Sequence, residues 1–295
     1  MSDEHSAEFK ISITQAMADQ LMATLGPLDR VILDKANLEA TAERPGVYEI
    51  FLHTESGDER LYVGKAAKSL RKRLEQHRRK ISGRVGIDPN AMRFICAYVD
   101  EDLDAAAPEK MLIKRYRDTG SVPWNTNGFG NNDPGRNRDT TLVKTNHFDA
   151  LYRINLDQLV EVTSTCGPAF AILDAIKTAA PYNVRYDRLR KKPHPDLVDT
   201  TVTVPAGAVP VRELLPIVVE QLPIGWQATA FPGYVILYPE PAEKVYASAM
   251  LMWRRNDDGV VIETPGLNRR KVSKRDIPED DASESDVEIE GEEDE

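Results

Sequence analysis

The order of secondary-structure signals between residues 46 and 120 is the feature that most constrains the fold of this chain. Two runs rich in β-branched and aromatic side chains, residues 46–52 and 60–64, flank a polar turn, which predicts an antiparallel hairpin. The succession strand, strand, helix, strand, helix is typical of a small α+β domain, here with an antiparallel or mixed three-stranded sheet flanked by helices. The later elements are expected at residues 69–81 (helix), 93–99 (strand) and 104–120 (helix).

The remaining signals divide the chain into four regions. Apolar residues recur every four positions from Ile13 to Leu25, which predicts a helical arm that Pro45 separates from the small domain. After the small domain, helical stretches precede strand-like segments, and no motif fixes their fold. The expected regions are 1–42 (N-terminal helical arm), 43–140 (small α+β domain), 141–265 (second α+β unit of unknown fold) and 266–295 (basic and then acidic disordered tail). In the second unit, helices are expected around residues 169–178 and 211–220, and strands around residues 233–238 and 247–254.

Charge is distributed unevenly along the chain. The net charge of −10 argues against a polyanionic partner, but residues 276–295 hold 12 acidic side chains and no Lys or Arg, which leaves +2 for the rest. Between Lys65 and Arg84 there are nine basic residues and one acidic residue. This concentration predicts a polyanion contact at the first helix. The side chains expected to make it are Lys65, Lys68, Arg71, Lys72, Arg78, Arg79 and Lys80.

Several protein classes are excluded by the sequence. No apolar run approaches the roughly 18 residues that cross a bilayer, and the N-terminal residues are acidic where a signal peptide would be basic. We therefore expect a cytoplasmic protein with no membrane partner. Two widely separated cysteines, Cys96 and Cys166, provide neither a disulfide framework nor a zinc quartet.

Five residues form a set suited to phosphodiester chemistry. Arg73 and His77 are four positions apart on the predicted helix and therefore lie on one face, where Arg can stabilise phosphoryl charge and His can hold or relay a proton. Tyr48 and Tyr62 lie on the adjacent predicted strands. Glu109, in the following helix, is a carboxylate able to hold Mg²⁺. Each residue alone is more typical of packing or of a solvated helix, and only the order and spacing of the set favour chemistry.

The set resembles the signature of the GIY-YIG nuclease superfamily, over about residues 43–135. Val replaces the central Ile of both tripeptides. The loop of residues 128–135, with the Trp124-Asn125 pair before it, looks most like the type II restriction endonuclease branch. The elements that carry the resemblance are Gly46-Val47-Tyr48, Tyr62-Val63-Gly64-Lys65-Ala66, Arg73, His77, Glu109 and Asn125.

The resemblance implies hydrolysis of DNA phosphodiester bonds with Mg²⁺ or Mn²⁺ as cofactor. The implied roles are Tyr48 as the base that deprotonates water with help from His77, Arg73 as the group that stabilises the transition state, Glu109 as the metal ligand, Tyr62 as the residue that orients the scissile phosphate, and Asn125 as a support.

The first hypothesis is a site-specific restriction endonuclease that acts on double-stranded DNA as a homo-oligomer, with a cognate DNA methyltransferase as a possible partner. A second hypothesis is a repair or recombination nuclease that recognises DNA structure, and a third is a non-catalytic DNA-binding module. A basic cluster between Arg185 and Lys192 could serve DNA binding or an oligomer interface, or be a solvated face. The acidic tail could keep the protein soluble or compete with DNA for the basic groove.

Overall fold

The hairpin beginning at Gly46 forms the centre of the first sheet of the computed structural model. The structure describes residues 13–99, 113, 116, 122–131, 133 and 135–272. The first sheet has the order β1-β4-β2-β3, and all of its neighbouring strands are antiparallel. Its strands are β1 (Val31–Ile32), β2 (Gly46–Thr54), β3 (Gly57–Ala66) and β4 (Met92–Tyr98).

A fourth strand therefore joins the three that were predicted. The short β1 pairs with β4 through Val31 opposite Phe94. A strand of two exposed residues has no alternating apolar pattern, so periodicity could not reveal it. It belongs to the region predicted as a purely helical arm, which also contains α1 (Ile13–Leu25) and α2 (Lys35–Ala40).

Each face of the first sheet is covered by helix. The helix α3 (Leu70–Ser82) packs on one face, where Leu70 and Leu74 are buried with Ile50. Its N-cap is Ser69, whose side chain accepts a hydrogen bond from the Lys72 backbone N–H. On the other face α1 packs through residues such as Leu25, which lies in one cluster with Phe51 of β2. The predicted helix over 104–120 lies outside the described residues except for Ile113 and Tyr116, which are helical.

The second sheet forms the centre of the C-terminal unit. Its order is β16-β15-β13-β14-β8, and only β8 runs parallel to its neighbour. Two helices, α6 (Ala169–Ala179) and α8 (Val211–Gln221), confirm the two predicted helical stretches. The strands are β8 (Asn183–Tyr186), β13 (Trp226–Ala230), β14 (Tyr234–Pro239), β15 (Leu251–Arg255) and β16 (Val261–Pro265).

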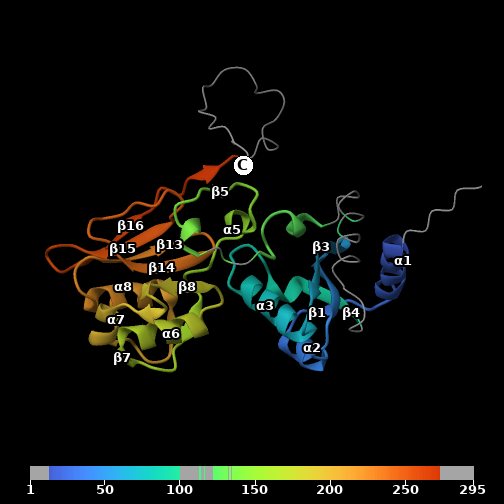
Figure 1. Cartoon of the computed structure of the whole chain (residues 1–295), viewed down its shortest axis with the longest axis horizontal. Helices are drawn as coiled ribbons and strands as arrows, with labels where there is room; N and C mark the ends of the chain where they lie inside the picture. Colours follow the sequence, from blue (N-terminus) through green and yellow to red (C-terminus); the bar gives the residue numbers. More distant parts are fainter. Residues whose placement is uncertain are drawn as a thin grey trace, which may run out of the picture.

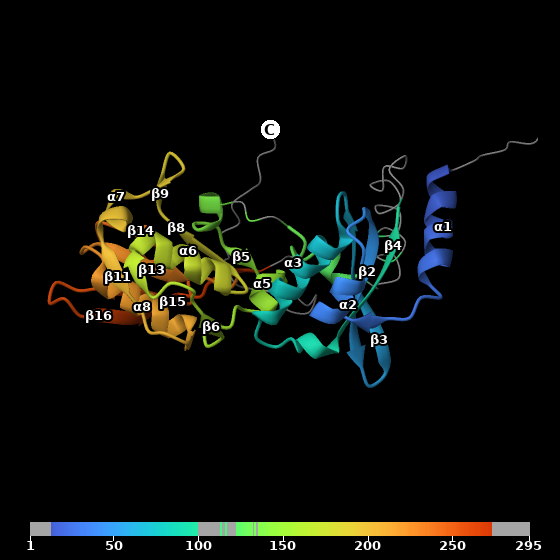
Figure 2. The same ribbon diagram turned by 90° about the horizontal axis from the view of Figure 1, so that it is seen from below.

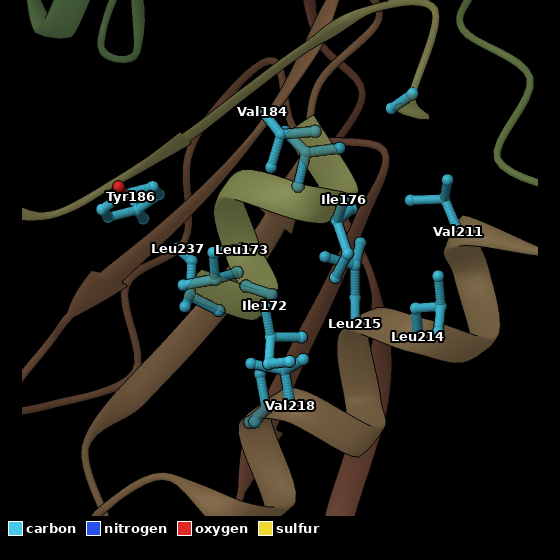
Figure 3. Packing of buried hydrophobic residues seen from close by; sticks show 14 of the residues in the cluster. Ile172, Leu173, Ile176, Val184, Tyr186, Val211, Leu214, Leu215, Val218 and Leu237 are labelled. Carbon is cyan, nitrogen blue, oxygen red and sulfur yellow. The ribbon is translucent and has the colours of Figure 1, made fainter. Parts of the chain in front are cut away.

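The core of this unit lies between the sheet and the two helices. Figure 3 shows Ile172 and Ile176 of α6 beside Leu215 and Val218 of α8, with Leu237 of the sheet close by. The smaller elements of this unit surround the core. They are β6 (Leu159–Glu161) paired with β12 (Ala208–Pro210), β7 (Cys166–Pro168) with β11 (Thr201–Thr203), β9 (Arg188–Leu189) with β10 (Lys192–Pro193), and the helix α7 (Pro195–Asp199).

The two sheets lie in separate halves of the molecule with α3 between them (Figure 1). Phe148 of α5 (Phe148–Leu151), beyond the predicted boundary at residue 140, packs in the core of the first sheet. Past the predicted boundary at residue 265, β17 (Arg270–Lys271) pairs with β5 (Val143–Lys144), so backbone hydrogen bonds order the first residues of the expected tail. The acidic segment lies outside the described residues.

Within the described residues, three short 3₁₀ turns connect the elements, at Pro89–Ala91, Pro123–Asn125 and Gly135–Arg138.

Within the described ranges, no helix has the length and apolar character needed to span a bilayer. Cys96 and Cys166 are both free thiols.

Contacts of Arg79 and Arg84 hold α3 and the residues after it against the second unit. Arg79 donates hydrogen bonds to the carbonyl oxygens of Lys177, Thr178 and Ala180 at the C-terminal end of α6. A cation there satisfies carbonyls that have no partner within the helix and complements the helix dipole. Just after α3, Arg84 forms an isolated backbone bridge to Ile154. The helix that bears the predicted site residues is thus also the joint between the two units.

Candidate active site

The register of the hairpin brings the two predicted tyrosines to one face. Tyr48 of β2 lies opposite Gly64 of β3, and Ile50 lies opposite Tyr62. Positions two apart on a strand share a face, so both tyrosine rings point toward α3. Their ring centroids are 6.1 Å apart.

Glycine is required opposite Tyr48. A Cβ atom on Gly64 would lie 2.4 Å from Tyr48 Oη and 2.7 Å from Tyr62 Cε1, which is too close for non-bonded atoms. A Cβ atom on Gly130 would lie 2.3 Å from Tyr62 Oη. The second tripeptide of the signature therefore ends in glycine because any larger side chain would displace both rings.

Arg73 and His77 meet the tyrosines from α3. Tyr48 Oη lies 2.7 Å from His77 Nε2, and Arg73 Nε donates a hydrogen bond of 3.3 Å to Tyr48 Oη. Arg73 also donates to the carbonyl oxygen of Gly130 at 3.2 Å. Because Arg73 donates to the Tyr48 oxygen, the Tyr48 proton is directed toward His77, which accepts it when the ring proton is on Nδ1. The structure thus joins Arg73, Tyr48 and His77 in one hydrogen-bonded chain.

Burial and nearby groups set the protonation states of the hydrogen-bonded side chains. Burial, followed by the nearby charges of Arg73 and Lys80, holds the pKa of His77 well below its ordinary value. Burial alone would lower the pKa of Arg73, but the Tyr48 and Tyr62 hydroxyls outweigh it and raise that pKa. At neutral pH the imidazole is therefore neutral and able to accept a proton, while the guanidinium is charged.

The loop that begins at Gly128, noted in the sequence for its resemblance, closes over the cluster through Phe129, which was not predicted as a site residue. The Phe129 ring stacks on His77 with centroids 4.7 Å apart, and Phe129 and Tyr48 are almost fully buried. Tyr62 is 8% exposed, whereas Arg73 is only partly covered, so Arg73 is the side chain of the cluster nearest solvent. The glycines on either side of Phe129 were the available signal, since Gly130 allows the chain to approach the Tyr62 ring closely and Gly128 allows it to approach the His147 ring.

Asn125 holds the edge strand that bears Tyr62. Its Oδ1 accepts from the Val63 N–H at 2.9 Å, and its Nδ2 donates to the Val63 carbonyl oxygen at 2.7 Å. Because β3 is at the edge of the sheet, these two backbone groups have no strand partner. The side-chain amide takes the place of a neighbouring strand, which gives the predicted support a structural basis.

The predicted metal ligand, Glu109, lies outside the described residues. Across the described ranges, no group of three or more His, Cys, Asp or Glu side chains could hold a metal ion. Mg²⁺ often binds through one or two carboxylates and water, so a site at Glu109 would not require such a group.

Most of the basic residues predicted to contact DNA have partners inside the protein. Arg71 donates to the carbonyl oxygens of Thr41 and Glu39, and Lys72 pairs with Glu43 at 2.7 Å. These contacts fix α2 and the chain after it against α3. Arg78 pairs with Glu75 on its own helix, and Arg79 binds the end of α6.

Lys80 is turned inward. Its ammonium donates to the Phe129 carbonyl oxygen at 2.6 Å, and burial lowers its pKa to about 8. Lys65 and Lys68 lie nearer the surface, and Lys68 is exposed. The basic run therefore serves largely to assemble the site, and Arg71 also pairs with Glu43 at 3.8 Å, whereas the contacts of Arg79 are to neutral carbonyl oxygens.

Residues 52–153 match the family model described as the Eco29kI GIY-YIG domain, which belongs to a family of type II restriction endonucleases. The matched range contains Tyr62, Arg73, His77, Glu109 and Asn125, and it starts four residues after Tyr48. No curated protein matches the chain.

Proposed function

We propose that this chain, whose residues 52–153 form a GIY-YIG domain of restriction endonuclease type, is a site-specific, metal-dependent endonuclease that hydrolyses phosphodiester bonds of double-stranded DNA. The observation that carries the proposal is the hydrogen-bonded chain of Arg73, Tyr48 and His77. A guanidinium beside a phenol and a neutral imidazole supplies both charge stabilisation and a proton acceptor.

Arg73 is the group that meets the phosphate. Of the three hydrogen-bonded side chains Arg73 is the least buried, it is charged, and its forked donors match phosphoryl oxygens. In the structure its donors are engaged by Tyr48, Gln76 and the Gly130 carbonyl. Binding of a phosphate exchanges some of these bonds for stronger bonds to charged oxygens.

Tyr48 and His77 handle the proton of the attacking water. The Tyr48 side chain is fully buried, so its hydroxyl becomes accessible to water only when Arg73 turns toward the phosphate. His77, neutral and 2.7 Å from Tyr48 Oη, receives the phenol proton as Tyr48 accepts one from water. Tyr62, beside Arg73 and packed against Gly130, orients the phosphate.

Mg²⁺ or Mn²⁺, held by Glu109, is part of the proposal. When bound, the ion would neutralise negative charge on the leaving oxygen. One active site cuts one strand at a time, which favours a homo-oligomer, and a cognate methyltransferase would be the partner that protects host DNA.

The test is a plasmid digest with Mg²⁺ or Mn²⁺, followed by sequencing of the ends. Native protein should give discrete fragments, and Glu109→Ala should not cut. Tyr48→Phe should lose about 10²- to 10⁴-fold in rate. Tyr98→Phe is the matched control, because its hydroxyl bonds the Ala42 N–H away from the cluster.

Three results would contradict parts of this proposal. Cutting confined to branched or damaged substrates would instead identify a structure-specific repair nuclease. DNA binding with no cutting of any template would indicate a non-catalytic module. Undiminished cleavage by Tyr48→Phe would remove Tyr48 from its role.

A further inference from the structure

A basic hairpin on the second unit has no part in the chemistry described so far. Residues 188–193 form β9, a two-residue turn and β10, with Leu189 paired to Lys192. Arg190 and Lys191 at the tip are exposed, as are Arg188 and Lys192. No ion pair involves the two tip residues or Lys192 within the part of the chain that the structure describes. Figure 2 shows the hairpin projecting from the second unit at the label β9.

The tip residues are unsuited to the turn they form. Arg190 has φ of 50° and Lys191 has φ of 71°, so both are left-handed. Two-residue hairpin turns with positive φ at both positions favour Asn-Gly, since the Cβ atom of most other residues crowds the backbone in this conformation. Asn268 is the one other non-glycine residue with positive φ in the described ranges. Arginine and lysine at positions that disfavour them indicate that their charges, rather than the formation of the turn, account for their presence at the tip.

The hairpin is held firmly at its base. The buried Asp187 carboxylate pairs with Arg136, and the Asp187 carbonyl oxygen accepts from the His194 N–H at 3.2 Å. Arg188 donates to Tyr186 Oη at 2.7 Å. The tip is thus presented in a fixed conformation, which reduces the entropy lost on binding.

The base is also tied to the candidate active site. Gly130, whose carbonyl oxygen accepts from Arg73, precedes Arg136 by six residues. Six residues span at most about 21 Å, which is less than one turn of B-DNA, about 34 Å. The base of the hairpin is therefore tied through this short segment to the loop that contacts Arg73, and a duplex bound at Arg73 that runs along the segment would reach the hairpin.

We propose that the β9–β10 hairpin is a second DNA contact, with Arg190 and Lys191 against backbone phosphates of the duplex beside the scissile bond. This inference rests on the proposed function, because DNA is the polyanion it names. A symmetric interface between two copies centred on this tip is disfavoured, since it would bring like charges together.

The test replaces the tip by the residues that its geometry prefers. Arg190→Asn with Lys191→Gly removes two charges, and the hairpin should remain folded because the turn is relaxed. Binding of a fluorescent mixed-sequence duplex is measured without divalent metal as salt is varied. The slope of log K against log salt is negative, and its magnitude should decrease by about 1.8, or 0.9 for each phosphate that the variant no longer neutralises. The melting temperature should not decrease.

The matched control is Lys35→Asn with Lys144→Asn, which removes the same charge from two exposed sites elsewhere. It should leave the slope near the native value. An unchanged slope in the hairpin variant, an equal fall in the control, or a change in oligomeric state in the hairpin variant alone would overturn the inference. If native protein binds and cuts DNA but the hairpin variant binds equally well, only this inference fails. If native protein binds no DNA, both proposals fail.

Discussion

Replacing Gly64 by alanine should disable the candidate active site while leaving its chemical groups in place. The new Cβ would lie 2.4 Å from Tyr48 Oη and 2.6 Å from Tyr48 Cζ. Gly64 is opposite Tyr48, and pairs flank it on both sides in the hairpin, so the backbone cannot move aside without breaking its pairing with β2. The tyrosine ring must move instead.

The size of the effect follows from these distances. Ordinary van der Waals contact begins near 3.4 Å, so Tyr48 Oη must shift by about 1 Å from its 2.4 Å position. A shift of that size away from His77 would lengthen the 2.7 Å contact beyond hydrogen-bond range. Misplacement by about 1 Å can cost on the order of 10²-fold in rate, and overpacking costs about 1–3 kcal/mol of stability.

Plasmid cleavage and urea unfolding of Gly64→Ala measure the two effects. Gly57→Ala is the control, since Gly57 is in the hairpin turn with φ of 123° and open space around it. Alanine there strains the backbone by about 1–2 kcal/mol without touching the tyrosines. A folded Gly64→Ala protein that cleaves at the native rate would refute the reasoning, as would an equal loss of cleavage in the control.

Three further changes test the surroundings of the site. Burial lowers the pKa of Lys80 to about 8, so charged Lys80 opposes folding below pH 8 and this penalty of about 3 kcal/mol fades as the pH rises toward 10.5. Urea unfolding of Lys80→Met should therefore show a smaller rise in stability between pH 8 and 10 than the native protein. Burial raises the pKa of Asp149, but Arg84 outweighs it and the pKa is about 2. Asp149→Asn should cost about 3–5 kcal/mol at pH 7, because Arg84 stays buried without its partner, and a loss under 1 kcal/mol would count against the ion pair. Asn125→Ala should cost about 2 kcal/mol and speed hydrogen exchange at the Val63 amide, whereas an unchanged exchange rate would contradict its role at the sheet edge.

The site was predictable from the sequence to the extent that it is built from neighbours in the chain. Tyr48 and Tyr62 share a hairpin, and Arg73 and His77 share the helix that follows. Short connections between these elements leave few ways to arrange them, so the motif order predicted the cluster. Phe129 reaches the same cluster from a distant loop, and no periodicity connects it with His77.

The use of the basic residues could not be predicted in this way. Lys68 and Lys80 are the same residue type in the same basic run, yet Lys68 is exposed and Lys80 is turned inward against the Phe129 carbonyl. The difference depends on where the helix lies relative to the loop, because Lys80 is on the part of α3 that meets the loop and Lys68 precedes the helix. Similarly, β13 is buried along its whole length although Gln227 and Thr229 are polar, and five residues that include two alanines carry little strand propensity, so it was not predicted as a strand.

The contact between Arg79 and the end of α6 limits which parts of this protein can be exchanged in a chimera. One helix presents Arg73 and His77 to the tyrosines and Arg79 to the end of α6. Exchanging the C-terminal unit for another domain would therefore leave the Arg79 guanidinium without its carbonyl partners. A chimera that keeps α3 must therefore also keep the carbonyl cluster of Lys177, Thr178 and Ala180. The two units are in this sense one structural assembly, and neither can be exchanged without loss of these hydrogen bonds.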